Sequence, residues 1–247
     1  MADLHDRIRD WWDADAAVYD HSPSHAASDP VEAAAWRAAL ETALPPHGKK
    51  VLDVGAGTGS MTLLAAELGY EVTALDLSPG MLERAQMKAA EQAVKASFVV
   101  GAAEEPPAGP FDAVMERHML WTLPDPDRAL RAWREVVAPG GRLVLFEGTW
   151  GGGGLAQRAR SAAAEGLRRL YGIPHDHHAE YDRELLAQLP LASQSSAEPM
   201  IHAVYRAGWR GVRIRRLRDV EWARRIATRP VLGWLEQIPQ YAIIADA

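Results

Sequence analysis

The chain has 247 residues, of which 48% are hydrophobic and 24% charged, the composition of a globular protein with a sizeable core. Its formal net charge of −6 argues against a nucleic-acid partner, since neutralising phosphates requires a basic face. With no cysteine, disulfides, thiolate metal sites and cysteine nucleophiles are excluded. Neither a secretory signal nor an apolar run near the ~20 residues that span a bilayer is present, so we expect a cytoplasmic protein without a membrane partner.

Two helices are predicted before the first strand. Residues 3–20 place apolar and aromatic side chains at roughly helical spacing on an acidic stretch. A second helix, residues 29–44, begins with Asp29 as its cap and Pro30 in its first turn. The Pro-Pro-His-Gly of residues 45–48 ends this helix.

From residue 49 short apolar strands alternate with helical segments. The predicted strands are 51–54, 71–75, 97–100, 111–116 and 142–147. The predicted helices between them are 60–68, 79–92 and 125–137, the last one capped by Asp125 and stopped by the Pro-Gly-Gly of residues 139–141. This alternation predicts parallel βαβ units and therefore a doubly wound α/β fold.

Residues 151–197 interrupt the alternation with a long helix, a loop and a short helix. It resumes with a helix at 199–207, a strand at 211–217, a helical stretch at 220–237 and a last strand at 241–245. The arginines of 206–218 alternate with apolar residues, which is typical of the exposed face of a strand. We predict a cofactor-binding core of residues 48–150 and 198–247, and a helical cap or substrate lid of residues 1–45 and 151–197.

A glycine-rich turn follows the first core strand. Gly55, Gly57 and Gly59 allow the chain to reverse tightly and to approach a ligand without a Cβ in the way. The spacing is G-x-G-x-G, whereas the dinucleotide fingerprint requires a glycine at the position of Ser60. Taken alone, the motif also fits any tight strand-to-helix turn.

The next strand ends in Asp76, 17 residues beyond Gly59. In a doubly wound sheet this acid lies beside the glycine loop, where it can accept hydrogen bonds from both hydroxyls of a ribose. Leu77 could then lie along the face of a purine. The alternative is that Asp76 only caps the helix that begins near Pro79.

Four segments taken together resemble the ordered motifs of the class I S-adenosylmethionine-dependent methyltransferases. They are residues 52–59 (LDVGAGTG), 74–82 (ALDLSPGML), 111–114 (FDAV) and 139–143 (PGGRL). The similarity covers roughly residues 48–150. It implies a Rossmann-like seven-stranded sheet with a reversed last strand, to which residues 241–245 would contribute, and S-adenosylmethionine as the cofactor.

The resemblance also assigns roles to individual residues. The glycine loop, with Ala56, would hold the methionyl part of the cofactor, Asp53 would orient its amino group, and Asp76 would bind the ribose. The family usually carries an aspartate where this chain has Ala102, so adenine recognition would rest on the Ala103 amide and on Glu104, unless Glu104 is a solvated loop acid. The complete set of expected cofactor residues is Asp53, Gly55, Ala56, Gly57, Gly59, Asp76, Leu77, Ala103, Glu104 and Arg117.

Residues 117 and 118 follow the fourth strand, at the edge where the cofactor would bind. Arg117 could meet the cofactor's carboxylate, and His118 is a candidate base because the pKa of histidine lies near neutrality. Further candidate bases are His175, His177 and His178, which lie in an expected cap loop. A metal site there is not expected, since neighbouring residues in an extended loop point in opposite directions.

The sequence therefore predicts an enzyme that transfers a methyl group from S-adenosylmethionine to oxygen, nitrogen or carbon of a small metabolite, as in secondary metabolism. A methyl transfer requires a base only if the acceptor is protonated. Two alternatives stay open: a nicotinamide-dependent oxidoreductase, which shares the sheet and the ribose acid, and a non-catalytic S-adenosylmethionine-binding module. A small-molecule acceptor is the expected partner, and a homo-oligomer is left open.

Overall fold

The computed structural model of the protein describes residues 2–21, 27, 29–148, 155–172, 181, 183–192 and 196–247. Its centre is a seven-stranded sheet in the order β3-β2-β1-β4-β5-β7-β6. The strands are β1 (Lys50–Val54), β2 (Glu71–Asp76), β3 (Ser97–Val100), β4 (Phe111–Arg117), β5 (Val137–Gly148), β6 (Arg210–Arg216) and β7 (Gln240–Asp246). β7 is antiparallel to both β5 and β6, while β1 to β5 pair in parallel. The predicted fold class, with its reversed last strand, is confirmed.

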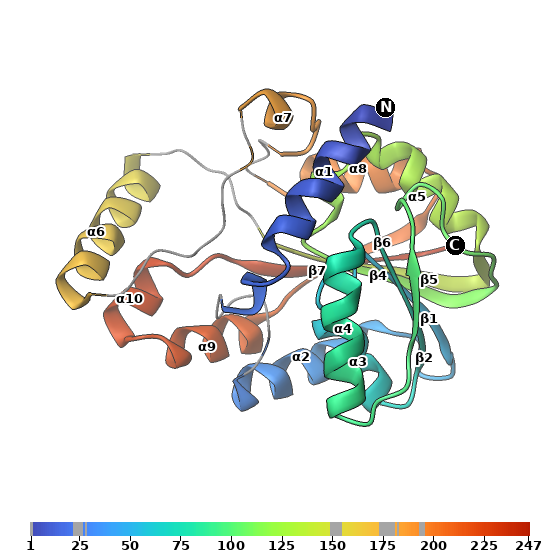
Figure 1. The fold of residues 1–247 in the computed structure, drawn as a ribbon, viewed down its shortest axis with the longest axis horizontal. Coiled ribbons are helices and arrows are strands. Elements are labelled where there is room, and N and C mark those ends of the chain that lie inside the picture. Colours follow the sequence, from blue (N-terminus) through green and yellow to red (C-terminus); the bar gives the residue numbers. More distant parts are fainter. Residues whose placement is uncertain are drawn as a thin grey trace.

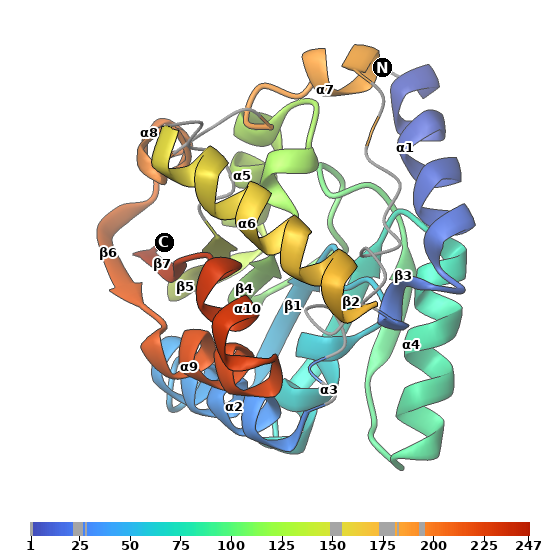
Figure 2. The same ribbon diagram turned by 90° about the vertical axis from the view of Figure 1, so that its left-hand side faces the viewer.

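Helices cover both faces of this sheet (Figures 1 and 2). They are α1 (Ala2–Asp15), α2 (Pro30–Ala43), α3 (Ser60–Glu67), α4 (Pro79–Glu91), α5 (Pro126–Glu135), α6 (Leu155–Tyr171), α7 (Arg183–Ala187), α8 (Glu198–Arg206), α9 (Arg218–Ala227) and α10 (Pro230–Leu235), with short 3-10 helices η1 (Tyr19–His21) and η2 (Leu120–Thr122). Helices α2, α3 and α9 lie on one face, and α5 and α8 on the other. Within the described part of the chain, no helix is both long and apolar enough to cross a membrane.

Alternate side chains of each central strand pack into two separate apolar cores, one on each face of the sheet. In β5, Leu143 and Leu145 pack with Trp133 of α5, whereas Val144 and Phe146 belong to the core on the opposite face. Side chains of a strand point alternately to its two faces, so a sheet covered on both sides needs apolar residues at consecutive positions. This is why the central strands read as continuous apolar runs.

Helix starts follow the capping chemistry expected from the sequence. Asp29 accepts hydrogen bonds from the amides of Val31 and Glu32, and Asp125 accepts one from the amide of Arg128. The cap of α4 is Ser78, whose hydroxyl accepts from the Met81 amide. Asp76 is therefore not the cap of that helix.

Two predicted boundaries are wrong. β5 begins at Val137, so residues 139–141 lie inside a strand with an irregular register against β4 rather than ending a helix. The helical stretch predicted at 220–237 is broken into α9 and α10, because Thr228 is extended and Pro230 has no N–H to donate to a continuing helix.

Helix α2 belongs to the sheet layers rather than to a cap. Its Trp36 and Leu40 are fully buried in the core that contains Phe146. Among the elements of the predicted cap, α1 and α7 share a small apolar cluster built on Ile8 and Leu185, whereas α6 packs against α10. Helix α1 also packs against α4 (Figure 2).

Candidate active site

The order of the strands reverses between β1 and β4, and the carboxyl ends of these strands border the main pocket. Parallel doubly wound sheets bind ligands at such switch points because the loops on either side diverge there. The main pocket encloses about 730 Å³ including its open mouth, which is the size range of small-molecule sites. A smaller pocket of about 290 Å³ shares with it Tyr19, Gly55, Gly57 and Arg117.

The glycine loop occupies the floor between the two pockets. Gly55, Gly57 and Gly59 all have positive φ, which favours glycine. A Cβ at Gly55 would lie 2.3 Å from Cγ of Met119, whereas one at Gly57 would meet open space. Gly59 lines neither pocket, and a Cβ there would lie 2.9 Å from that of Ala85 in α4. The first two glycines therefore shape the ligand site, and the third permits helix packing.

Asp76 is half-buried in the wall of the main pocket. Oδ2 accepts a hydrogen bond of 2.7 Å from the Gly57 amide, and Oδ1 accepts one of 2.8 Å from the Ser78 amide. Burial raises the pKa of Asp76 to about 6, against the opposing effect of these amide donors. Each carboxylate oxygen can accept a further bond, so a diol is a suitable ligand for this acid.

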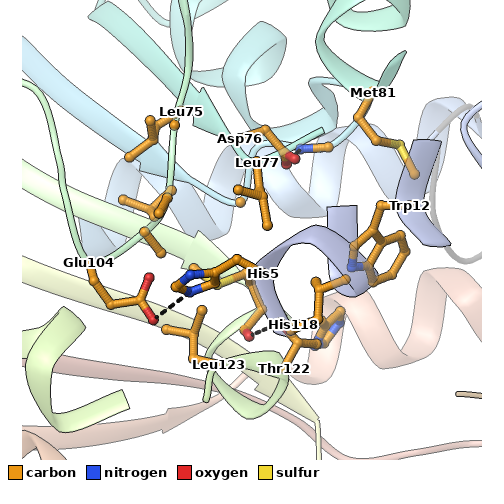
Figure 3. Close-up of a pocket in the computed structure, with 18 of the residues that line it drawn as sticks. His5, Trp12, Leu75, Asp76, Leu77, Met81, Glu104, His118, Thr122 and Leu123 are labelled. Atoms are coloured by element: carbon orange, nitrogen blue, oxygen red, sulfur yellow. Dashed lines mark hydrogen bonds and ion pairs between the residues drawn. The ribbon is translucent and has the colours of Figure 1, made fainter. Parts of the chain in front are cut away.

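One end of the main pocket is apolar and closed by a polar pair. Leu75, Leu77 and Leu123 line it, and His5 of α1 contacts Glu104 with 3.3 Å between Nε2 and Oε1 (Figure 3). The Glu104 side chain is only 3% exposed. Glu104 is therefore not a solvated loop acid. The Ala103 carbonyl accepts a bond from Trp133, and Ala103 itself lines the pocket.

The smaller pocket carries the charged groups. Arg117, at the end of β4, lines it together with Asp53 and Ala56, and its guanidinium lies 5.4 Å from the ring centre of Trp36. Burial lowers the pKa of Arg117. Asp53 accepts a hydrogen bond from the hydroxyl of Thr62, and burial raises its pKa to about 7. A ligand with both a carboxylate and an amino group fits this pair.

The N-terminal segment covers the pocket. His5, Ile8, Trp12 and Tyr19 line it from above, and Figure 3 shows Trp12 at the end opposite Glu104. Two aspartates tie the segment down. Asp13 accepts bonds from the Ser78 hydroxyl and, at 2.9 Å, from the Gly80 amide; Asp20 accepts from Thr58 at 2.6 Å and from Lys88 at 2.8 Å.

His118 lies at the same end of the pocket as Trp12 (Figure 3). Its φ of +59° is unusual for a residue with a side chain. Its Nδ1 lies 3.5 Å from Oε2 of Glu147 in β5. The other three candidate bases, His175, His177 and His178, lie outside the described residues. Among those described, no group of three or more histidine or acidic side chains could hold a metal ion.

Comparisons with known proteins agree with this geometry. Residues 52–145 match the family model described as a methyltransferase domain. The chain is 39% identical over 138 residues to a ubiquinone biosynthesis O-methyltransferase of Xanthomonas axonopodis pv. citri (strain 306), covering 55% of this chain and 54% of that protein. The chain thus spans about half the length of the curated relatives it matches.

Two solved structures share the fold. One is a chain from the complex between the Haloferax volcanii Trm112 methyltransferase activator and a methyltransferase, with a TM-score of 0.65, 17% identity and 97% coverage of each chain. The other is Haemonchus contortus phosphoethanolamine N-methyltransferase 2 in complex with S-adenosyl-L-methionine, with a TM-score of 0.59, 16% identity, and coverage of 96% of this chain and 59% of that one. At these identities the likeness shows the fold alone.

Residues 52–145 therefore form a methyltransferase domain. This domain agrees with the family predicted from the ordered motifs, and S-adenosyl-L-methionine is the ligand in the Haemonchus contortus structure.

Several residues of the methyltransferase domain's pocket were not predicted from the sequence. His5, Met119 and Leu123 line it, and Glu147 lies behind His118. Trp12 and Tyr19, which also line the pocket, lie in the predicted cap, where the signal was aromatic residues at roughly helical spacing on an acidic stretch. Nothing local distinguishes His5 or Glu147, because their relation to the site depends on how α1 and β5 pack.

Proposed function

We propose that this chain transfers a methyl group from S-adenosylmethionine to a nucleophile of a small metabolite. The observation that carries the proposal is a pair of adjoining pockets, which share Gly55, Gly57 and Arg117 and together provide an apolar end, a central diol acceptor and a charged end. Leu75 and Leu77 flank the first, Asp76 forms the second, and Arg117 stands at the third. An adenosine joined to an amino acid has these three chemistries in this order.

The residues present fit that cofactor. Gly57 leaves open space where a Cβ would stand, and Asp76 keeps acceptor capacity beyond its two amide donors. We propose that Asp76 holds the ribose, that Arg117 and Asp53 hold the carboxylate and amino groups, with the backbone of Ala56 beside them, and that Leu77, Ala103 and Glu104 surround the adenine.

The acceptor is proposed to enter on the Trp12 side. Trp12 belongs to an aromatic cluster with ring-centre separations of 4.6 Å to Trp11, 5.9 Å to Tyr19 and 6.0 Å to Tyr181. Such a wall suits a flat or apolar molecule. The cover provided by α1 and the net charge of −6 favour a small acceptor over a nucleic acid.

When bound, S-adenosylmethionine supplies a methyl group already activated by its sulfonium sulfur. The protein's task is to align the acceptor with that methyl group and to exclude water. Trp12 and Tyr19 cover the site, the glycine loop fixes its floor, and His118 lines the same pocket. The curated relatives' name favours oxygen as the accepting atom.

Calorimetry with S-adenosylhomocysteine and with NAD tests this assignment. We expect binding of the first and none of the second; comparable affinity for NAD would overturn the proposal. Turnover is then measured as S-adenosylhomocysteine formation in the presence of phenol, alcohol, amine and carbon-acid probes. Product formation that requires a macromolecular acceptor instead would contradict the small-molecule class.

A further inference from the structure

A histidine at the pocket is backed by a buried acid. The His118 side chain keeps 16% of its surface exposed, whereas that of Glu147, which lies behind it, is 3% exposed. The 3.5 Å between Nδ1 and Oε2 places the carboxyl group within ion-pair distance of the ring. One nitrogen of the imidazole therefore faces an acid, while the residue itself borders the pocket.

The backbone holds this arrangement in place. At φ +59°, His118 lies in the left-handed region that favours glycine. Its amide donates a 3.0 Å hydrogen bond to the carbonyl of Phe146, the residue before Glu147. The same end of strand β5 thus holds both the backbone of the histidine and its acidic neighbour. A strained residue beside a ligand pocket is an observation that points to function.

A second buried acid stands beside the first. Glu116 is fully buried and accepts hydrogen bonds of 2.8 Å and 3.2 Å from the amides of Met119 and Leu120. Burial raises the pKa of Glu116 to about 8, and burial together with repulsion from Glu116 raises the pKa of Glu147 well above its usual range. Two such neighbouring acids hold one proton between them, so the pair carries a single negative charge, which lies on Glu147 when the imidazole beside it is protonated.

The other titratable groups of the pocket are unsuited to accept a proton from an acceptor. Glu104 is paired with His5 at the opposite end, and Asp76 is held by two amides. Arg117 has no basic lone pair. Burial raises the pKa of Tyr19 to about 12, so its phenol stays protonated.

We propose that His118 removes the proton from a hydroxyl acceptor, and that Glu147, backed by Glu116, is a positioning residue that orients the imidazole and stabilises its protonated form. This inference rests on the proposed methyl transfer. The acceptor oxygen gains the methyl carbon and gives its proton to Nε2 of His118, while the electron pair of the breaking carbon–sulfur bond stays on sulfur. The proton then passes to water. An alcohol or phenol requires this base because its proton is retained at neutral pH.

A histidine titration tests the positioning role without any acceptor. Ring signals are followed by NMR against pH in the S-adenosylhomocysteine-saturated wild type and in Glu147→Gln, with His118→Gln to assign the resonance. We expect the pKa of His118 to fall by about one unit or more in Glu147→Gln, because a lost carboxylate disfavours the imidazolium. The exposed His202 serves as internal control and keeps its titration. An unchanged His118 pKa overturns the proposal.

Turnover with two phenols tests the role of His118 as a base. Catechol keeps its proton at pH 8, whereas 4-nitrocatechol is largely ionised there. We expect His118→Gln to lower kcat about 10²–10⁴-fold with catechol and far less with 4-nitrocatechol, and His202→Gln to change neither. Equal losses on the two phenols, or wild-type turnover of amine or carbon probes alone, would contradict the hydroxyl assignment. Failure of the wild type to bind S-adenosylhomocysteine would instead contradict the proposed function.

Discussion

Two pairs of acids lie at the same edge of the sheet, and their surroundings differ. At the ends of β1 and β2, Asp53 and Asp76 accept hydrogen bonds from a hydroxyl and from two amides, which oppose the effect of burial on their pKa values. Glu116 and Glu147 lie near the ends of β4 and β5. Repulsion from Glu116 adds to the effect of burial, and both raise the pKa of Glu147. The first end, with Asp53 and Asp76, therefore favours charged carboxylates that accept hydrogen bonds from a ligand. The second end, with Glu116 and Glu147, favours carboxyl groups that keep a proton.

The largest effect is expected at the first end. Asp76→Asn should weaken S-adenosylhomocysteine binding on the order of a hundredfold, since hydrogen bonds to a charged group contribute roughly 1.5–3 kcal/mol each. Calorimetry measures the loss. Asp112→Asn is the matched control, because Asp112 also accepts two amide bonds, from Lys49 and Lys50 at the start of β1. Equal affinity in the two variants would remove Asp76 from the site.

Gly55 lies between the two ends of the site, and a Cβ added there would collide with Met119. Gly55→Ala should lower the free energy of unfolding by about 2–4 kcal/mol, from overpacking together with the left-handed backbone. Gly57→Ala shares the positive φ without the collision, so about 1–2 kcal/mol is expected. Urea unfolding compares them, and equal losses would show that Met119 yields without cost.

At the end formed by Glu116 and Glu147, the pH dependence of the free energy of unfolding tests whether Glu116 is protonated. The pKa of Glu116 is raised to about 8 in the folded protein, so its contribution to stability falls as pH rises from its unfolded pKa towards 8. Glu116→Gln removes that loss. We expect the variant to gain on the order of 2 kcal/mol relative to wild type at pH 9 and little at pH 5. A difference that is independent of pH would contradict a raised pKa.

The smallest effect is expected where the N-terminal segment is tied to the first end. Asp20→Asn weakens the contacts with Thr58 and Lys88, and a partly exposed ion pair contributes up to about 1 kcal/mol. Hydrogen exchange of residues 8–21 should become several-fold faster in the variant. Asp10→Asn, an exposed change in α1 of the same N-terminal segment, is the control. Equal protection in both variants would show that Asp20 does not fasten the segment.

The glycine loop and Asp76 could be predicted because their signals are local. A turn with positive φ selects glycine, a strand end selects its position at the sheet edge, and the interval between Gly59 and Asp76 matches one βαβ unit. Caps such as Asp29 and Asp125 are equally local, since each satisfies amides within three residues of itself. Here elementary stereochemistry was sufficient.

The amino-acid sequence by itself determined the sheet, its crossovers and the acids at the ends of β1 and β2, because periodicity and turn chemistry act over a few residues. Only the tertiary structure decided that α2 joins the sheet layers, that His5 meets Glu104, and that Glu147 stands behind His118. The first two contacts join residues about a hundred positions apart, and the third depends on the register of β4 against β5. Such contacts arise from packing and strand pairing, which no local pattern encodes.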